Sequence, residues 1–198
     1  MSSSRARARS SSGSWGRERI PNPPAPAPRT LQAVGARGSG PGAPAVGAIV
    51  RTLRAVGAEG PGLVALFDAR GIAGEAHLLS AWAHLERARA RGASRLRDRG
   101  AELALYVAGD DQLPRALAKV GAAADSAQYV LVAERPRELP KLLEAFGLVA
   151  DPTAYPRPPD EATLERLGIT EPERRIVPRD RWEGLVLERV ALLDLEHG

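Results

Sequence analysis

Glycines divide the apolar residues of this chain into short runs and helical stripes, and this pattern is the strongest constraint on its fold. Two compact runs, Leu63–Phe67 and Tyr129–Ala133, have the length and the flanking turn residues of buried strands. Thr30–Ala36 alternates between apolar and small or polar residues and predicts a third, short strand. Between these runs, apolar residues recur at helical spacing and stop at a glycine. Strands interspersed with helices predict the α/β class.

Helical patterns fill most of the remaining chain. The clearest is Gly74–Arg91, where Leu78, Trp82 and Leu85 recur at i, i+4 and i+7. With no internal repeat, we expect one α/β (α+β) domain over residues 30–198, with a small mixed central β-sheet packed with helices and a C-terminal helix. The other expected helices are Pro44–Val56, Leu96–Ala108, a helix capped by Asp110 or Asp111 that runs to Val120, Arg137–Phe146, Asp160–Leu167 and the terminal Arg181–Leu195.

Residues 1–29 have a different composition, rich in serine, arginine and proline, and are predicted to be disordered because they offer few apolar residues. Of the chain's 28 basic and 24 acidic residues, this segment holds six arginines and one acid, Glu18. Residues 30–198 therefore carry 22 basic and 23 acidic residues and are close to neutral. The segment is read as a passive extension, with RNA contact or a transit peptide as the alternatives.

The chain has no cysteine, which excludes disulfides, thiolate nucleophiles and thiolate metal sites. No stretch approaches the roughly 20 apolar residues of a membrane helix, and no apolar signal-peptide core follows the basic N-terminus. A cytoplasmic location is therefore expected, without contact to a membrane. The glycines of Gly35–Gly40 follow a strand but lack the Gly-Lys-Ser/Thr ending of a phosphate loop, and are interpreted as a simple loop.

The sequence shows no motif of an active site or a metal site. His77 and His84 are seven residues apart, whereas two histidines that chelate a metal from one helix are usually four apart. No Gly-x-Ser-x-Gly motif is present. We expect no metal and no cofactor, and we name no catalytic residue. An enzyme or small-molecule binder with scattered site residues, for example Glu75 and His77, stays open as an alternative.

One cluster of charge stands out, with six arginines within thirteen residues. The cluster spans the end of the best helix and the turn after it, and only Glu86 and Asp98 oppose it nearby. Two interpretations are open: a solvated face that also favours the helix dipole, or a ridge that contacts phosphates and unpaired bases of RNA. The six residues are Arg87, Arg89, Arg91, Arg95, Arg97 and Arg99.

Four segments, in this order and spacing, resemble a known family. The chain from about Leu31 to its C-terminus is similar to the small accessory subunit of the KEOPS complex, the family of the PRPK-binding protein (TPRKB), in its archaeal form. It departs from the family pattern at Asp111, where a basic residue often precedes the glutamine, and at Pro114. The segments are AGEAHLLS (Ala73–Ser80), SR (Ser94–Arg95), ELALYVAGDDQL (Glu102–Leu113) and LVLERVALL (Leu185–Leu193).

The resemblance implies a non-catalytic regulatory subunit. Such a subunit binds and activates the kinase-like ATPase of KEOPS, contacts the other subunits indirectly and holds the 3′ CCA end of tRNA, for threonylcarbamoyl-adenosine modification. A kinase regulator outside tRNA modification is the remaining alternative. The expected RNA contacts are Arg91, Ser94, Arg95, Arg97 and Arg99, and the expected kinase contacts are Leu185, Val186 and Arg189.

Overall fold

The structure is a computed structural model that describes residues 31–39 and 62–195 of the 198-residue chain. The segment predicted to be disordered, residues 1–29, and the predicted helix Pro44–Val56 lie outside the described residues.

Within the described residues, four strands form one sheet in the order β2-β3-β1-β4, and all three pairings are antiparallel. The strands are β1 (Gln32–Gly38), β2 (Val64–Asp68), β3 (Gln128–Ala133) and β4 (Leu148–Ala150). β3 lies between β2 and β1, and its last five residues are buried. Both faces of β3 are covered, which explains why its sequence is a continuous apolar run rather than an alternating one.

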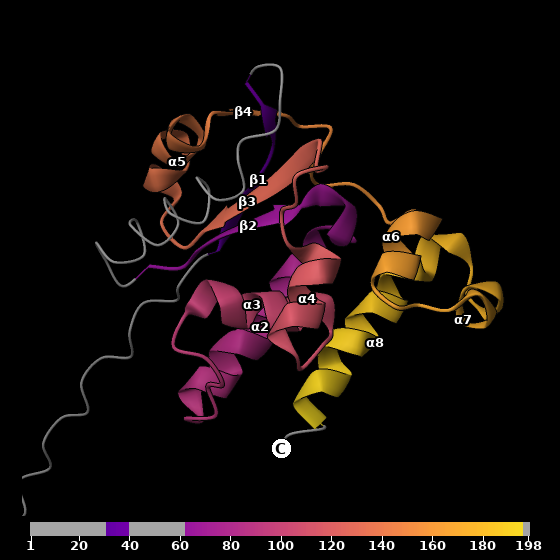
Figure 1. Cartoon of the computed structure of the whole chain (residues 1–198). Coiled ribbons are helices and arrows are strands. Elements are labelled where there is room, and N and C mark those ends of the chain that lie inside the picture. The colour runs from indigo at the N-terminus through magenta and orange to yellow at the C-terminus, as the bar shows by residue number, and fades with distance from the viewer. Residues whose placement is uncertain (1–30, 40–61, 196–198) are drawn as a thin grey trace, which may run out of the picture.

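Helices cover both faces of the sheet, so the domain has three layers (Figure 1). On β2, Ala65 and Phe67 point toward the larger helical layer, whereas Leu66 points toward the opposite face with α5. The predicted α/β class, with a helix-packed sheet and a C-terminal helix, is confirmed, although the described strands of the sheet are antiparallel rather than mixed in direction. The α-helices are α2 (Glu75–Ala90), α3 (Arg99–Ala108), α4 (Leu113–Val120), α5 (Leu139–Phe146), α6 (Glu161–Arg166), α7 (Glu171–Ile176) and α8 (Trp182–Leu195), and three short 3-10 turns are η1 (Ala69–Gly71), η2 (Pro136–Glu138) and η3 (Arg179–Arg181).

The interpretation of Gly35–Gly40 as a simple loop is wrong for its first part, because β1 continues to Gly38. Gly35 lies inside the strand, where the segment Asp151–Tyr155 crosses closely above it. A Cβ atom at this position would meet the Tyr155 backbone nitrogen at 2.7 Å. The glycine is therefore needed for close packing between backbones and not for a phosphate cradle.

Two helix starts differ from the prediction. α3 begins at Arg99 and not at Leu96, because the Asp98 side chain accepts a hydrogen bond from the Ala101 N–H and caps the helix there. α4 begins at Leu113 with Gln112 at its N-cap, while Asp110 accepts from the Gln112 N–H. The strand β4 and the helix α7 were not predicted, since both are too short to show a periodic pattern.

His77 joins three elements of the larger helical layer. Its ring is fully buried; Nδ1 accepts from the Ala73 N–H at 3.0 Å and Nε2 donates to the Val107 carbonyl of α3 at 2.8 Å. The His77 backbone N–H donates to the Glu183 carboxylate of α8 at 3.3 Å, which places an anion at the N-terminus of α2. Burial lowers the pKa of His77 to about 4, so the ring is neutral at pH 7.

The stability of the fold should therefore fall as the pH drops from about 6.5 to about 4. In this window the unfolded chain protonates His77 whereas the folded chain does not, and the loss reaches about 3 kcal/mol once the pH is below both pKa values. Urea unfolding of the wild type and of His77→Gln at several pH values measures this effect. At pH 7 the variant is less stable than the wild type, but it lacks the loss of stability between pH 6.5 and pH 4. Equal pH dependence of the two proteins would contradict the conclusion that His77 is buried as a neutral ring.

Candidate nucleic-acid and partner interfaces

The turn in the middle of the arginine cluster is built on one buried carboxylate, Glu102 of α3. Ser94 Oγ donates to Glu102 Oε2 at 2.7 Å, and the Arg95 backbone N–H donates to Oε1 at 2.7 Å. Arg89 adds an ion pair to Oε2 at 3.2 Å. Glu102 is fully buried, and these donors compensate its charge. Ser94, a predicted RNA contact, is thus already engaged in shaping the turn.

Arg95 connects the turn to α8, because its guanidinium donates to the Leu193 carbonyl at 3.2 Å. This bond lies near the C-terminal end of α8, where carbonyl groups lack partners within the helix. Its side chain is only partly exposed. Arg95 therefore connects the turn to α8 and is not fully available to a ligand.

Arg99 is largely buried, with 10 % of its side chain exposed. It forms ion pairs with Glu86 at 2.6 Å and with Glu134 at 2.5 Å, and its guanidinium lies 5.3 Å from the centre of the Trp82 ring. Burial by itself would lower the pKa of Arg99, but the hydrogen bonds that Arg99 donates to Glu134 and Glu86, and the negative charge of these two residues, raise the pKa above its ordinary value. Arg99 thus ties α2 and α3 to the end of β3, and the prediction of an accessible RNA contact does not fit this buried position.

The cluster is therefore divided into two groups with different environments. Arg99 is largely buried, and Arg89 and Arg95 are half-buried and bonded to groups within the domain. Arg87, Arg91 and Arg97 are exposed around the end of α2 and the following turn. Sequence reasoning missed Glu102, although a single carboxylate in the apolar stretch Ala101–Ala108 was a usable signal.

Two of the three residues predicted to contact the kinase pack into the domain itself. Val186 is 1 % exposed and belongs to the core, so it cannot also form an interface on this surface. Leu185 is partly buried against the same core. The exposed side of α8 is formed by other residues: Leu192 is 46 % exposed, and Glu188 and Ala191 are also exposed.

Arg189, the third predicted kinase contact, lies between α8 and the neighbouring helices. Its guanidinium pairs with Glu173 of α7 at 2.7 Å. Its Cβ packs on Gly109, where a Cβ atom would meet it at 3.1 Å and where φ is +57°, a left-handed conformation that favours glycine. Arg189 is 38 % exposed, so it contributes to packing and keeps some contact with solvent.

A second polar cluster, which sequence reasoning missed, surrounds the buried Asp68 at the end of β2. Its carboxylate pairs with Arg70 at 2.6 Å and accepts from Ser126 Oγ at 2.7 Å, while Arg166 of α6 lies 3.6 Å away. Burial raises the pKa of Asp68, but the bonds from Arg70 and Ser126 outweigh it and keep the pKa below its ordinary value. The cluster ties β2 to α6 and is saturated with internal partners.

The remaining candidates do not form a reactive site. Glu75 is exposed, whereas both ring nitrogens of His77 are used inside the core, so the two residues do not share a pocket. Asp110 pairs with Arg115 and Lys119, and Asp111 also pairs with Arg115. Within residues 31–39 and 62–195, no group of three or more metal-ligating side chains converges. In the same ranges, no helix has the length and apolar character needed to cross a bilayer.

No protein-family model matches the chain, and no curated protein matches it significantly.

Replacing Arg99 by alanine should destabilise the domain by about 3 kcal/mol, because Glu134 and Glu86 would be left partly buried without their cation. Arg97→Ala, an exposed neighbour in the same cluster, should change stability by no more than about 0.5 kcal/mol. Urea unfolding monitored by circular dichroism measures both. Similar losses for the two variants would contradict the division of the cluster.

Proposed function

We propose that this chain is a non-catalytic accessory subunit of a KEOPS-type complex. In this role it binds and activates a kinase-like ATPase subunit and holds the 3′ CCA end of tRNA, for threonylcarbamoyl-adenosine modification in the cytoplasm. The proposal begins from the resemblance of four separate segments to that family, and one property of the fold supports it.

The supporting observation is that the four segments contact one another, although they are spread over 121 residues of the chain (Ala73–Leu193). His77 of the first segment bonds Val107 of the third, and Arg95 of the second bonds Glu102 of the third. Arg95 also reaches the Leu193 carbonyl of the fourth segment. Residues that a family shares for one purpose are expected to form one unit in space, and these segments do.

The exposed arginines support the tRNA part of the proposal. Arg87, Arg91 and Arg97 lie at one end of the larger helical layer, on a body that is otherwise close to neutral. A local set of guanidinium groups is suited to phosphates and to stacking on the unpaired bases of a single-stranded end. Arg99 is not included among the proposed RNA contacts, because it is buried. Ser94 is not included either, because its hydroxyl bonds Glu102 and stabilises the turn.

The outer side of α8 supports the partner part. Leu192 is 46 % exposed beside the exposed Ala191, and both follow the exposed Glu188 by about one turn. An apolar side chain of this size on an ordered helix is a candidate anchor for a protein partner, since the centre of a stable interface is depleted of charge. We therefore propose Leu192 as the partner contact in place of Val186, because Val186 is buried in the core.

No observation in the described part of the chain favours the enzyme alternative, since Glu75 and His77 do not meet in a pocket. The other alternative, a kinase regulator outside tRNA modification, differs from the proposal in one measurable respect. Deleting the gene should abolish threonylcarbamoyl-adenosine in tRNA if the proposal is right and leave it unchanged if the alternative is right. Affinity purification of the full chain from native extract should recover the kinase-like and transferase subunits.

Arg91→Glu combined with Arg97→Glu should weaken tRNA binding and make it less dependent on salt. Each lost phosphate contact should reduce the slope of log K against log salt by about 0.7 for a single strand. Filter binding or fluorescence anisotropy at several salt concentrations measures the slope. A tRNA without its CCA end should bind the wild type as weakly as intact tRNA binds the variant.

The matched control is Arg137→Glu with Lys141→Glu, two exposed basic residues next to and on α5, which covers the opposite face of the sheet (Figure 1). It changes the net charge by the same amount, so it should leave binding close to wild type. Equal losses for both pairs would indicate a general charge effect, and equal binding of tRNA with and without CCA would refute the role in holding that end.

Leu192→Glu should abolish co-purification with the kinase-like subunit while the domain stays folded, because the side chain is already partly in solvent. Leu117→Glu on α4 is the matched control, since Leu117 is also 46 % exposed. It should retain the partner. Pull-down from extract together with circular dichroism checks both; partner binding by Leu192→Glu at wild-type strength would refute this interface.

A further inference from the structure

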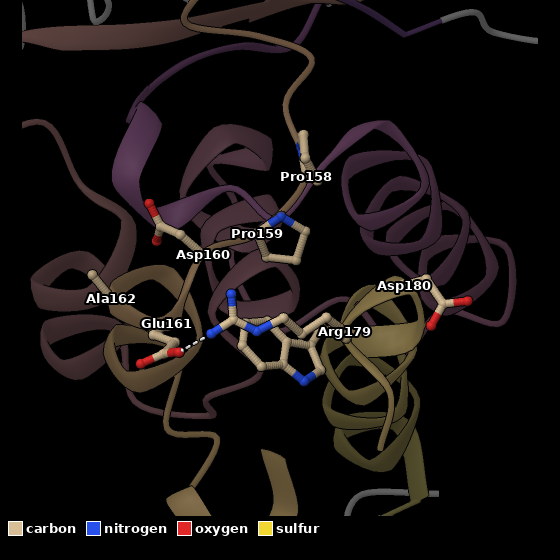
Figure 2. Close-up of a pocket in the computed structure, with 8 residues that line it drawn as sticks. Pro158, Pro159, Asp160, Glu161, Ala162, Arg179 and Asp180 are labelled. Atoms are coloured by element: carbon tan, nitrogen blue, oxygen red, sulfur yellow. Dashed lines mark hydrogen bonds and ion pairs between the residues drawn. The ribbon is translucent and has the colours of Figure 1, made fainter. Parts of the chain in front are cut away.

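An open groove of about 610 Å³ lies where the proline-containing segment before α6 meets the start of α8. Its apolar lining comes from Pro158, Pro159, Ala162 and Trp182, of which Trp182 is only 6 % exposed. Figure 2 shows Glu161 and Ala162 on one side of the groove and Arg179 and Asp180 on the other. This groove lies outside the arginine cluster and the outer side of α8, so the proposed function does not use it.

The residues that line the groove carry three carboxylates and one guanidinium. Asp160 is engaged, because it caps α6 through the Thr163 N–H and pairs with Arg157. Glu161 and Asp180 are exposed: Glu161 pairs with Arg179, whereas the carboxylate of Asp180 lies at the edge of the groove and points away from Glu161 (Figure 2). The groove therefore combines an apolar floor with an excess of negative charge.

Arg179 shows that a guanidinium fits this groove. Its guanidinium lies 4.9 Å from the centre of the Trp182 ring and pairs with Glu161 at 2.5 Å (Figure 2). Both partners of this ion pair are largely exposed, 77 % for Arg179 and 61 % for Glu161. Ion pairs between such exposed groups are weak, so another arginine can displace Arg179 at little cost.

We propose that this groove binds a proline-rich segment that carries arginine, and that its occupant is residues 17–29 of the same chain. This segment, Arg-Glu-Arg-Ile-Pro-Asn-Pro-Pro-Ala-Pro-Ala-Pro-Arg, has five prolines, three arginines and one acid. Proline-rich segments favour the polyproline II conformation and dock in grooves lined by aromatic and proline side chains. Its positive charge complements Glu161 and Asp180, whereas the rest of the domain is close to neutral.

The length of the segment allows the contact within one molecule. Gln32 begins β1 in register with Ala133, while Gly35 lies beneath Tyr155, three residues before Pro158. The seven residues of β1 span about 23 Å. Thirteen residues in the polyproline II conformation span about 40 Å, so a segment that ends just before β1 is long enough to run along the strand toward the groove.

The absence of cysteine permits a direct test on the full chain. Ala25→Cys introduces one thiol for a nitroxide label, and the indole N–H signals of ¹⁵N-labelled protein report its proximity. We expect the Trp182 signal to lose most of its intensity, whereas Trp82, which packs against Arg99, keeps it. Charge reversal by Glu161→Arg with Asp180→Arg should restore the Trp182 signal. The matched pair Glu144→Arg with Glu188→Arg, at exposed positions outside the groove, should not restore it.

Three outcomes would overturn the proposal: equal broadening of Trp82 and Trp182, no recovery in the groove variant, or equal recovery in both variants. A second sample tests whether the segment comes from the same molecule or from a second copy. It mixes ¹⁴N chain that carries the nitroxide with ¹⁵N chain that has no nitroxide. Broadening of Trp182 in that mixture would show that a second copy supplies it, which would overturn binding within one molecule. Circular dichroism of each variant confirms that the fold is retained.

Discussion

The helical layer depends on the buried imidazole of His77. Its two nitrogens and its backbone N–H together connect the segment before α2, the carbonyl of Val107 in α3 and the Glu183 carboxylate at the start of α8. The two ring bonds require a neutral ring with its proton on Nε2, and burial keeps the ring neutral by lowering its pKa. The relative positions of α2, α3 and α8 follow from this arrangement, and so do the two candidate surfaces that these helices carry.

Buried carboxylates have a comparable influence on the arginine cluster. Arginines that are alike in sequence differ in role because Glu102 and Glu134 recruit some of them: Arg89 and Arg99 neutralise these acids, while Arg97 stays on the surface. Such pairing buries Arg99 and partly buries Arg89, so only part of the clustered charge faces solvent fully. The proposed tRNA contact is therefore limited to the exposed guanidinium groups at one end of α2, those of Arg87, Arg91 and Arg97.

The proposed accessory role and the proposed groove use different parts of the same charge distribution. The body is close to neutral, so local sets of like charge determine what each surface attracts. Arginines gather around the end of α2, whereas carboxylates dominate the groove at the start of α8. The two proposals are thus independent, and either can fail without the other.

The sequence by itself determined the α/β class and most element positions, because apolar period and terminal glycines are local signals: β2, β3, α2, α6 and α8 were predicted within one or two residues. The short elements β4 and α7 lacked such a signal. Only the tertiary structure decided which side chains are accessible. Three features depend on segments that are distant in sequence. Val186 is buried by the helical core, and Arg99 is buried beside Glu134. Gly35 is packed against Asp151–Tyr155. Accessibility is a property of packing between such segments, which a local pattern does not contain.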